Sequence, residues 1–331
     1  MLFKQINYFF ATITLIILFL FGIDNTALAD TIASSESCKI GTFVTSIHSL
    51  NVKDKSFAID FWVWSNCASE INPLKTMEVT NAIKFAAEQD STEKKGNIYW
   101  SQRKYRATIY QNWKTENFPF DRQHLYVELE DGAADISKRI YIPDVKNSSL
   151  SQNIILDGFK IKDFQIQELK FNYPTSFGDP EINHAGSTFS RLRIRMTIVR
   201  QEFFGFFKLN MGTYIAFAIT LLSFLMHPKQ TSIFSARMSL LVGSLFAVVI
   251  SMRASDSIIG TSQGLSLIDQ IHITTMVYIF SSAAIAIFSL RCCETGHDKL
   301  ALRIDARCLW IFAASFVAMN GVLISTAIFR G

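Results

Sequence analysis

The residues of this chain with the most specific chemistry are one acidic turn and one distant arginine. Pro119 stands between Phe118 and Phe120, and Asp121 follows them directly. A proline between two aromatic side chains favours a tight, packed turn, with either a trans or a cis bond before it. A carboxylate in such a turn is costly to bury without a partner. From the residues alone, Asp121 caps its own turn, and Arg200, at the border of a long apolar segment, extends toward lipid headgroups.

A second set of residues recurs every three or four positions in one apolar segment, which is the repeat of one helix face. Its members are Ser239, Gly243, Phe246, Ile250, Arg253 and Ser257. Small residues at one end would leave ions hydrated, while Phe246 and Ile250 would form an apolar constriction that gates by dewetting when several copies meet. The alternative is ordinary helix packing, because Ser239, Gly243 and Ala247 also form a pattern of small residues four apart.

Enzymatic chemistry finds no support in the sequence. There is no metal-ligand triad, glycine-rich phosphate loop or nucleophile elbow. We therefore expect no enzyme, no catalytic residue, no cofactor and no metal site. The net charge of +4 is a small excess, and no basic run with interleaved aromatic residues suggests nucleic acid as a partner.

Four apolar segments are each long enough, at roughly 20 residues, to cross a membrane. They are Phe203–Met226, Ala236–Ile258, Ile271–Leu290 and Leu309–Phe329, within a predicted four-helix transmembrane domain at 201–331. The loops at 227–235 and 291–308, together with Arg237, hold most of the Lys and Arg residues near the spans, whereas the opposite ends hold Arg253 and Arg330. This asymmetry predicts that the two loops are cytoplasmic.

Residues 1–29 predict a secretory signal peptide. Lys4 supplies a positive start, residues 9–21 are nearly all apolar, and Ala27-Leu28-Ala29 fits a cleavage site before Asp30. An uncleaved anchor helix is the alternative. Either way, the segment after it is expected to be exported.

Residues 30–200 show the period-two alternation of β-strands. Apolar residues take every second position over 57–63, 125–129 and 192–198. Several such runs joined by turns predict a β-sandwich, and 159–200 predicts a long hairpin with an extended tip. The expected fold class is therefore an all-β exported sandwich followed by a four-helix, all-α transmembrane bundle.

The five cysteines divide between the two compartments. Cys38 and Cys67 would lie opposite each other if the flanking strands form a hairpin that turns near Lys53-Asp54. A disulfide and two free buried thiols are both open for this pair. Cys292, Cys293 and Cys308 fall on the cytoplasmic side, where we expect free thiols or lipid attachment points.

Over residues 35–330, the chain resembles the prokaryotic members of the pentameric ligand-gated ion channels, the Cys-loop receptor superfamily. The sharpest similarity is the segment Asn117–Gln123, NFPFDRQ, which resembles the tip of the loop that gives the superfamily its name. The cysteines that bracket this loop in animal members are absent, since Gln111 and Leu125 occupy their places. Their absence is usual for bacterial members.

The resemblance implies that this loop couples agonist binding to the pore. Asp121 is then expected to pair with Arg200, and Asp54, in the first hairpin turn, to join them. The implied coupling residues are Asp54, Phe118, Pro119, Phe120, Asp121 and Arg200.

The resemblance also implies that the second span lines the channel, and the start of that span bears on ion selectivity. Cation-selective members usually carry a Glu at the cytoplasmic mouth, where this chain has Ser235-Ala236. Ala236-Arg237 instead resembles the inner mouth of the chloride-passing glycine and GABA receptors. Arg253 adds positive charge near the outer mouth, although Asp256 opposes it. We expect anion selectivity, with cation selectivity as the alternative.

The agonist site implied by the resemblance lies between neighbouring subunits. The expected ligand-binding residues are Trp62, Trp64, Arg106, Tyr110, Phe171, Tyr173 and Phe177. An aromatic cage would favour an ammonium ligand, whereas Arg106 would suit a carboxylate. Protons are a third candidate, with His48, His124 and His184 as sensors. Exposed strand aromatics that only pack at the rim of the sandwich are the simpler alternative.

Taken together, these features predict a homopentameric, ligand-gated ion channel of a bacterial inner membrane, with its N-terminal domain in the periplasm. Its expected partners are a small-molecule or proton agonist, inorganic ions and membrane lipids. The alternative is a membrane-anchored periplasmic receptor that signals without conducting.

Overall fold

A computed structural model describes residues 35–88, 90–178, 186–201, 204–227, 231–259 and 264–330. Ser35–Gly331 forms one compact unit, to which all that follows refers. The predicted signal peptide at 1–29, His184 and Phe203, the first residue of the first predicted span, lie outside the described residues.

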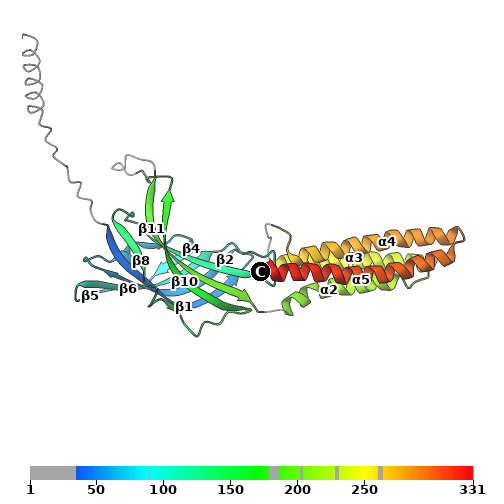
Figure 1. Ribbon diagram of the computed structural model, residues 1–331, viewed down its shortest axis with the longest axis horizontal. Coiled ribbons are helices and arrows are strands. Elements are labelled where there is room, and N and C mark those ends of the chain that lie inside the picture. Colours follow the sequence, from blue (N-terminus) through cyan, green and yellow to red (C-terminus); the bar gives the residue numbers. More distant parts are fainter. Residues whose placement is uncertain are drawn as a thin grey trace, which may run out of the picture. The chain divides into compact units, whose positions relative to one another are not determined.

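The N-terminal part of this unit consists of two β-sheets (Figure 1). The first has the strand order β4-β6-β2-β1-β8, with β5 paired to β6 and β9 paired to β1. Its strands are β1 Glu36–Asn51, β2 Ser56–Cys67, β4 Ala82–Ala87, β5 Ser91–Lys95, β6 Ile98–Tyr110, β8 Arg139–Pro143 and β9 Ser149–Leu150. The second has the order β10-β11-β7-β3, with β3 Met77–Val79, β7 Arg122–Asp131, β10 Phe159–Tyr173 and β11 Ser187–Arg200. A short helical turn, η1 at Pro73–Lys75, precedes β3.

The alternation in the sequence corresponds to the core between these sheets. Along β2 every second residue is buried, and Phe57, Ile59, Phe61 and Val63 have no exposed surface. Leu125, Val127 and Leu129 of β7 and alternate residues of β11 from Leu192 to Ile198 are buried in the same cluster. β2, β7 and β11 therefore each turn one face to the core, as a period of two requires.

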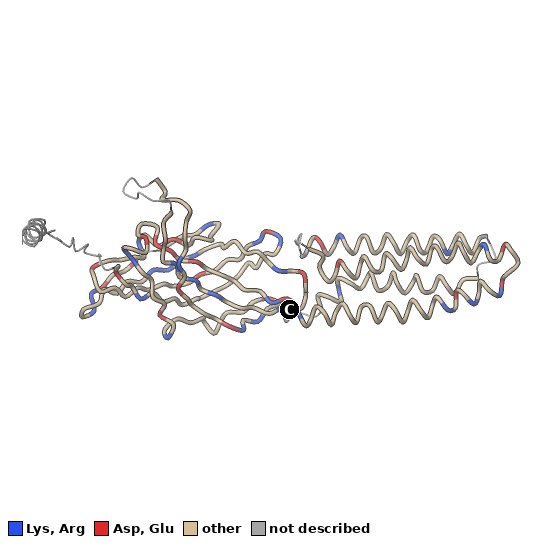
Figure 2. Tube along the Cα trace, turned by 45° about the horizontal axis from the view of Figure 1, so that its top comes forward, with Lys and Arg blue, Asp and Glu red and all other residues tan. Residues whose placement is uncertain are grey.

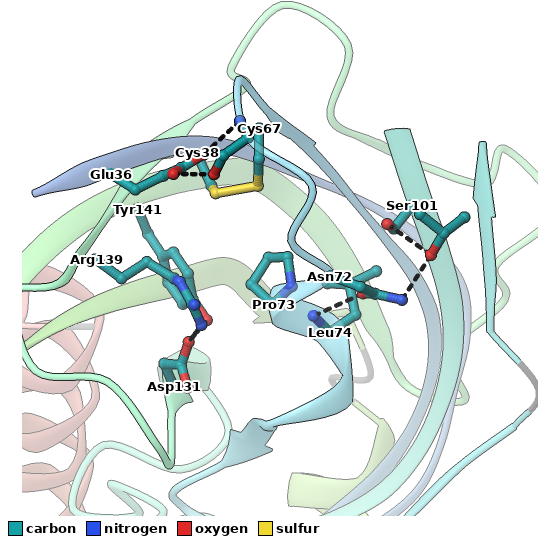
Figure 3. Close-up of a disulfide and its surroundings, with 12 residues drawn as sticks. Glu36, Cys38, Cys67, Asn72, Pro73, Leu74, Ser101, Asp131, Arg139 and Tyr141 are labelled. Carbon is teal, nitrogen blue, oxygen red and sulfur yellow. Dashed lines mark hydrogen bonds and ion pairs between the residues drawn. A yellow bond between two sulfur atoms is a disulfide. The ribbon is translucent and has the colours of Figure 1, made fainter. Parts of the chain in front are cut away.

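The predicted hairpin that brings Cys38 and Cys67 together is confirmed. β1 pairs antiparallel with β2, and Lys39 lies opposite Asn66. The two cysteines form a disulfide inside the core cluster (Figure 3). Of the two alternatives for this pair, the structure therefore supports the bridge.

Four long helices follow: α2 Phe204–Ser223, α3 Thr231–Ile259, α4 Leu267–Glu294 and α5 Asp298–Arg330. All four are long and apolar enough to span a membrane, and Lys, Arg, Asp and Glu are found mostly toward their ends (Figure 2). α4 and α5 extend beyond the predicted spans, so the expected loop at 291–308 is mostly helical and only 295–297 connects them. A capping box formed by Ser266 and Asp269 starts α4.

The helices cover each other only in part. Between 17% and 33% of the residues in each span's most apolar window are buried within the chain. Most of the apolar helix surface is therefore left to contact lipid or other protein chains.

Candidate functional site

The first candidate site lies where the β-domain contacts the helices. Arg200 ends β11, and its Nε donates to Asp121 Oδ1 at 3.0 Å. The guanidinium also lies over two aromatic rings, at 4.4 Å from the centroid of Phe118 and 4.3 Å from that of Phe159. The expected ion pair is therefore present, and Asp121 does more than cap its own turn.

Asp121 is held by a second polar group. It is 3% exposed, and Gln123 Nε2 donates to its Oδ2 at 2.7 Å. Gln123 in turn bonds both the backbone N–H and the carbonyl of Lys114. A carboxylate with a guanidinium on one side and an amide on the other is satisfied despite its burial.

The turn before Asp121 contacts the helices directly. The Phe118–Pro119 peptide bond is cis. Phe118 belongs to a buried cluster with Phe206 of α2 and Leu267 of α4, and the backbone N–H of Leu267 donates to the carbonyl of Glu116 at 2.9 Å. Phe120 packs against Phe206, with 6.3 Å between the ring centroids. The turn thus joins β11 to the first residues of two helices.

Asp54 does not join this ion pair. Its carboxylate accepts a hydrogen bond from Asn51 Nδ2 at 2.8 Å, and its backbone N–H donates to Asn51 Oδ1. The expectation that Asp54 pairs with Arg200 is therefore wrong for this structure, because the short hairpin turn satisfies its own carboxylate. Phe159, Gln123 and Glu116 belong to the site and were not predicted. Phe159 could have been inferred only from the strand register, which places it opposite Arg200.

The second candidate site is one face of α3. All six predicted members of the stripe are exposed, with Phe246 at 63% and Ile250 at 67%. The opposite face is buried at Arg237, Leu241, Ser244, Val248 and Ser255. A Cβ added to Gly243 would meet no atom within 4 Å, so Gly243 does not serve packing inside this chain, whereas Ala247 of the same small-residue pattern packs against a buried cluster.

Arg237 does not belong to that exposed face. Ser235 and Ala236 are exposed, but Arg237 is 1% exposed and forms two hydrogen bonds with Asp305 of α5, at 2.8 and 3.1 Å. The expectation that Arg237 places a positive charge at a pore mouth is therefore wrong for this structure. A buried guanidinium requires a partner, and the sequence did not show that Asp305 would supply it.

The third candidate site is a pocket of about 460 Å³ on the four-stranded sheet. Three carboxylates and three aromatic side chains contribute to its lining, namely Glu78, Glu130, Asp135, Tyr173, Phe177 and Phe189, together with Lys138. The rings form one cluster, in which Tyr173 lies 5.1 Å from Phe177 and 5.6 Å from Phe189. The carboxylates and Phe189 were not predicted.

A hydrogen-bond chain orders the wall of this pocket. Arg191 donates to Glu130 Oε2 and to the hydroxyl of Tyr173, which donates to Glu130 Oε1 at 2.9 Å. Arg191 also lies 3.7 Å from the centroid of the Phe171 ring. Burial, together with the bond to the Glu130 carboxylate and its charge, raises the pKa of Tyr173, so the phenol keeps its proton and its donor role.

The remaining predicted ligand residues lie on the other sheet. The Trp64 indole covers Gly41, where an added Cβ would approach the ring to 2.3 Å, and its Nε1 donates to Asp144 at 3.2 Å. Arg106 pairs with Glu88 at 2.8 Å. Trp62 is half-buried and Tyr110 is exposed. Within one chain these four residues are not part of the aromatic pocket.

The proton-sensing candidates differ in their surroundings. His48 is exposed. Burial and the nearby charges of Arg195, Lys114 and Arg122 lower the pKa of His124, whose ring bonds Thr197 Oγ1 at 3.0 Å. A lowered pKa disfavours His124 as a sensor near neutral pH.

Comparison with models of known protein families and with curated proteins gives no match for this chain.

Proposed function

We propose that this protein is a ligand-gated ion channel assembled from five identical subunits, with the exposed stripe of α3 lining a central path for ions. The observation that carries this proposal is the composition of that stripe. Ser239, Arg253 and Ser257 are exposed on α3, as is Ser235, whereas the exposed residues between Leu240 and Ile250 are apolar. Polar and charged groups on a membrane span are costly in lipid and are expected to face water.

The middle of the stripe supplies a gate. Among the large apolar side chains of α3 whose exposure is described, Phe246 and Ile250 are the most exposed, and they lie one helical turn apart. Five copies around an axis would form two apolar rings, which exclude water when they are narrow. Rings of this kind gate by small changes in helix position.

The ligand that best fits the pocket is a small cation, and we propose an amine. Arg191 already neutralises Glu130, but Glu78 and Asp135 still outnumber Lys138 there, while the rings of Tyr173, Phe177 and Phe189 offer faces for cation–π attraction. Of the three agonist classes left open by the sequence, this composition favours the ammonium.

The path from pocket to pore would run through the Asp121–Arg200 pair. β11 carries Arg191 beside the pocket and Arg200 at its end, and the turn that binds Arg200 contacts α2 and α4. A displacement of β11 on ligand binding would therefore act on the starts of two helices.

For selectivity and location we keep the sequence-based expectations as proposals. With Arg237 neutralised, Arg253 is the charged member of the stripe and favours anions. The asymmetry of Lys and Arg supports an orientation with the β-domain on the outer side, and the resemblance to prokaryotic members supports a bacterial inner membrane with this domain in the periplasm. The protein acts without catalysis, and its other partners are ions and lipids.

The Phe246→Ala variant tests the proposal without knowledge of the agonist. Truncating the five Phe246 side chains to alanine removes one of the two proposed apolar constrictions. We therefore expect a constitutive leak, measured as current across a bilayer or cell membrane. Phe280→Ala is the matched control, because Phe280 is 76% exposed but lies on α4. Dilution of NaCl on one side then gives the selectivity from the reversal potential.

Three outcomes distinguish an anion channel, a cation channel and a receptor that does not conduct. A leak in Phe246→Ala alone, reversing with chloride, supports the channel and its proposed selectivity. A leak that reverses with sodium keeps the channel and overturns the selectivity. Surface-expressed protein with no current in either variant would instead favour the receptor that does not conduct.

A further inference from the structure

Side chains of α3, α4 and α5 and of the residue that follows α2 meet at Arg237, near the predicted cytoplasmic end of α3. Its two terminal nitrogens bond the carboxylate of Asp305 on α5. Asp305 Oδ1 also accepts a hydrogen bond at 2.7 Å from Ser289 Oγ of α4. Phe224, the residue after α2, places its ring 5.3 Å from the guanidinium.

This cluster holds one complete charge pair away from water. The side chains of Arg237 and Asp305 are 1% and 2% exposed. Arginine keeps its charge even when buried, so the pair is neutral only while Asp305 is present. Loss of Asp305 would therefore leave an uncompensated positive charge at Arg237.

The position of Arg237 on α3 determines how an uncompensated charge there would act on the proposed ion path. Ser235 and Ser239 are two residues away on either side, which places them about 200° around the helix from Arg237. Both are exposed on the proposed pore face, while Arg237 is on the buried face with Leu241. The charge thus lies directly behind the inner mouth, about one helix diameter from the ion path.

We propose that Asp305 is a selectivity-determining residue that acts through Arg237. By pairing with the guanidinium on the buried face, it keeps five positive charges from contributing to the field at the inner mouth. The peripheral helix α5 thereby controls the electrostatics of a pore that it does not line. This inference rests on the proposed channel function.

The test compares reversal potentials in the leaky Phe246→Ala background. Adding Asp305→Asn is expected to raise the chloride-to-sodium permeability ratio about threefold or more, because five uncompensated charges then act across a short, partly screened distance. Adding Arg237→Gln together with Asp305→Asn should return the ratio to that of Phe246→Ala. Ser289→Asp combined with Asp305→Asn should do the same, because Ser289 already contacts the pair.

Glu294→Gln in the same background is the matched control. Glu294 is an exposed acid at the cytoplasmic end of α4, so its loss changes the net charge equally without releasing Arg237. An unchanged ratio is expected. If Glu294→Gln raises the ratio as much as Asp305→Asn does, the effect belongs to the overall charge and the proposal is overturned.

The remaining outcomes separate this inference from the proposed function. No current in Phe246→Ala itself refutes the channel, while a conducting background with an unchanged ratio in Asp305→Asn refutes only the role of Asp305. If Asp305→Asn does not assemble, Asp305→Ser replaces it, since the smaller side chain admits water beside the guanidinium. If Asp305→Asn and Asp305→Ser both fail to assemble while the variant that combines Arg237→Gln with Asp305→Asn assembles, the ion pair serves assembly alone and the proposal is overturned.

Discussion

The Arg200 side chain is held in three ways at once. A carboxylate binds its edge, and the rings of Phe118 and Phe159 lie against its faces. Lysine would keep the charge but lose the planar contact with two rings and the fixed direction of the Nε bond. The site therefore requires arginine, and not merely a cation.

Replacement of Arg200 tests this requirement. Arg200→Ala leaves Asp121 buried without its cation and is expected to destabilise the protein by about 3–5 kcal/mol. Arg200→Lys is expected to fold but to lose most agonist-evoked current. Thermal unfolding and current in the same preparations check both. Lys160→Arg, an exposed change at the neighbouring edge of β10, is the control, and full currents from Arg200→Lys would contradict the stacking argument.

Glu130 is the corresponding residue at the ligand pocket. Glu130→Gln removes a buried acceptor that bonds both Arg191 and Tyr173. We expect the concentration of an amine that gives half-maximal current to rise about tenfold or more, because charge-assisted hydrogen bonds contribute about 1.5–3 kcal/mol. A panel of primary and quaternary amines, with carboxylates for comparison, provides the measurement. Glu168→Gln, on the same sheet but outside the pocket, should leave the response unchanged, and a carboxylate agonist would contradict the amine proposal.

At the scale of elements, the β1–β2 pair shows how one strand shapes its neighbour. Gly41 lies opposite Trp64 in the register, and the indole occupies the space that any larger residue at 41 would need. Trp64 therefore has a structural task within one chain. This contact does not exclude a second task at a subunit interface.

A double-mutant cycle measures that contact. Gly41→Ala is expected to lower the free energy of unfolding by about 1–3 kcal/mol, because it forces the indole off Gly41 and away from Asp144. In a Trp64→Ala background the same change should be neutral or slightly stabilising, since alanine then fills open space. Equal losses in both backgrounds would show that the indole is not the cause.

The elements were the most predictable level of this structure. Alternation at Phe57–Val63 identified a half-buried strand, and the three- and four-residue spacing from Ser239 to Ser257 identified the exposed face of α3. Both follow from local periodicity. α4 and α5 extend past the predicted apolar spans, and the added turns include the buried residues Leu267, Ala301 and Asp305, which hydropathy windows do not indicate.

Side-chain partners were less predictable than elements. Asp305 and Arg237 are far apart in sequence, and only the packing of α5 against α3 brings them together. Glu130 alternates with buried residues along β7 and so appeared exposed, but Arg191 of β11 and Tyr173 of β10 cover it. Such contacts depend on the register between strands that are distant in sequence, and the sequence of a single strand does not show that register.

At the scale of the whole molecule, the uncovered helix surface requires explanation. No more than a third of each span's most apolar window is buried within the chain. Lipid can cover apolar residues, but it does not suit the polar stripe of α3. Copies of the chain around a shared axis would cover both, with the stripe facing inward.

The number of chains in the particle tests this arrangement. We expect the detergent-solubilised protein to contain five chains, measured by mass photometry or native mass spectrometry. The disulfide should be present in each chain, and reduction at neutral pH should lower thermal stability without changing the number of chains, because Cys38 and Cys67 lie within one subunit's core. A stable monomer or dimer would rule out the proposed pore.

The pairing of β10 with β11 runs without interruption from Tyr173 opposite Ser187 down to Asp163 opposite Thr197, where a register shift next to Ile161 breaks its regularity before Phe159 meets Arg200. In the proposed channel, the hydrogen bonds between β10 and β11 would carry a displacement at the pocket along both strands toward Arg200. The register shift at Ile161–Asp163 would let the ribbon bend there, because a bulge bends the strand that contains it. Agonists would then be graded by the angle through which they turn this lever, and the tightest binder need not be the strongest activator.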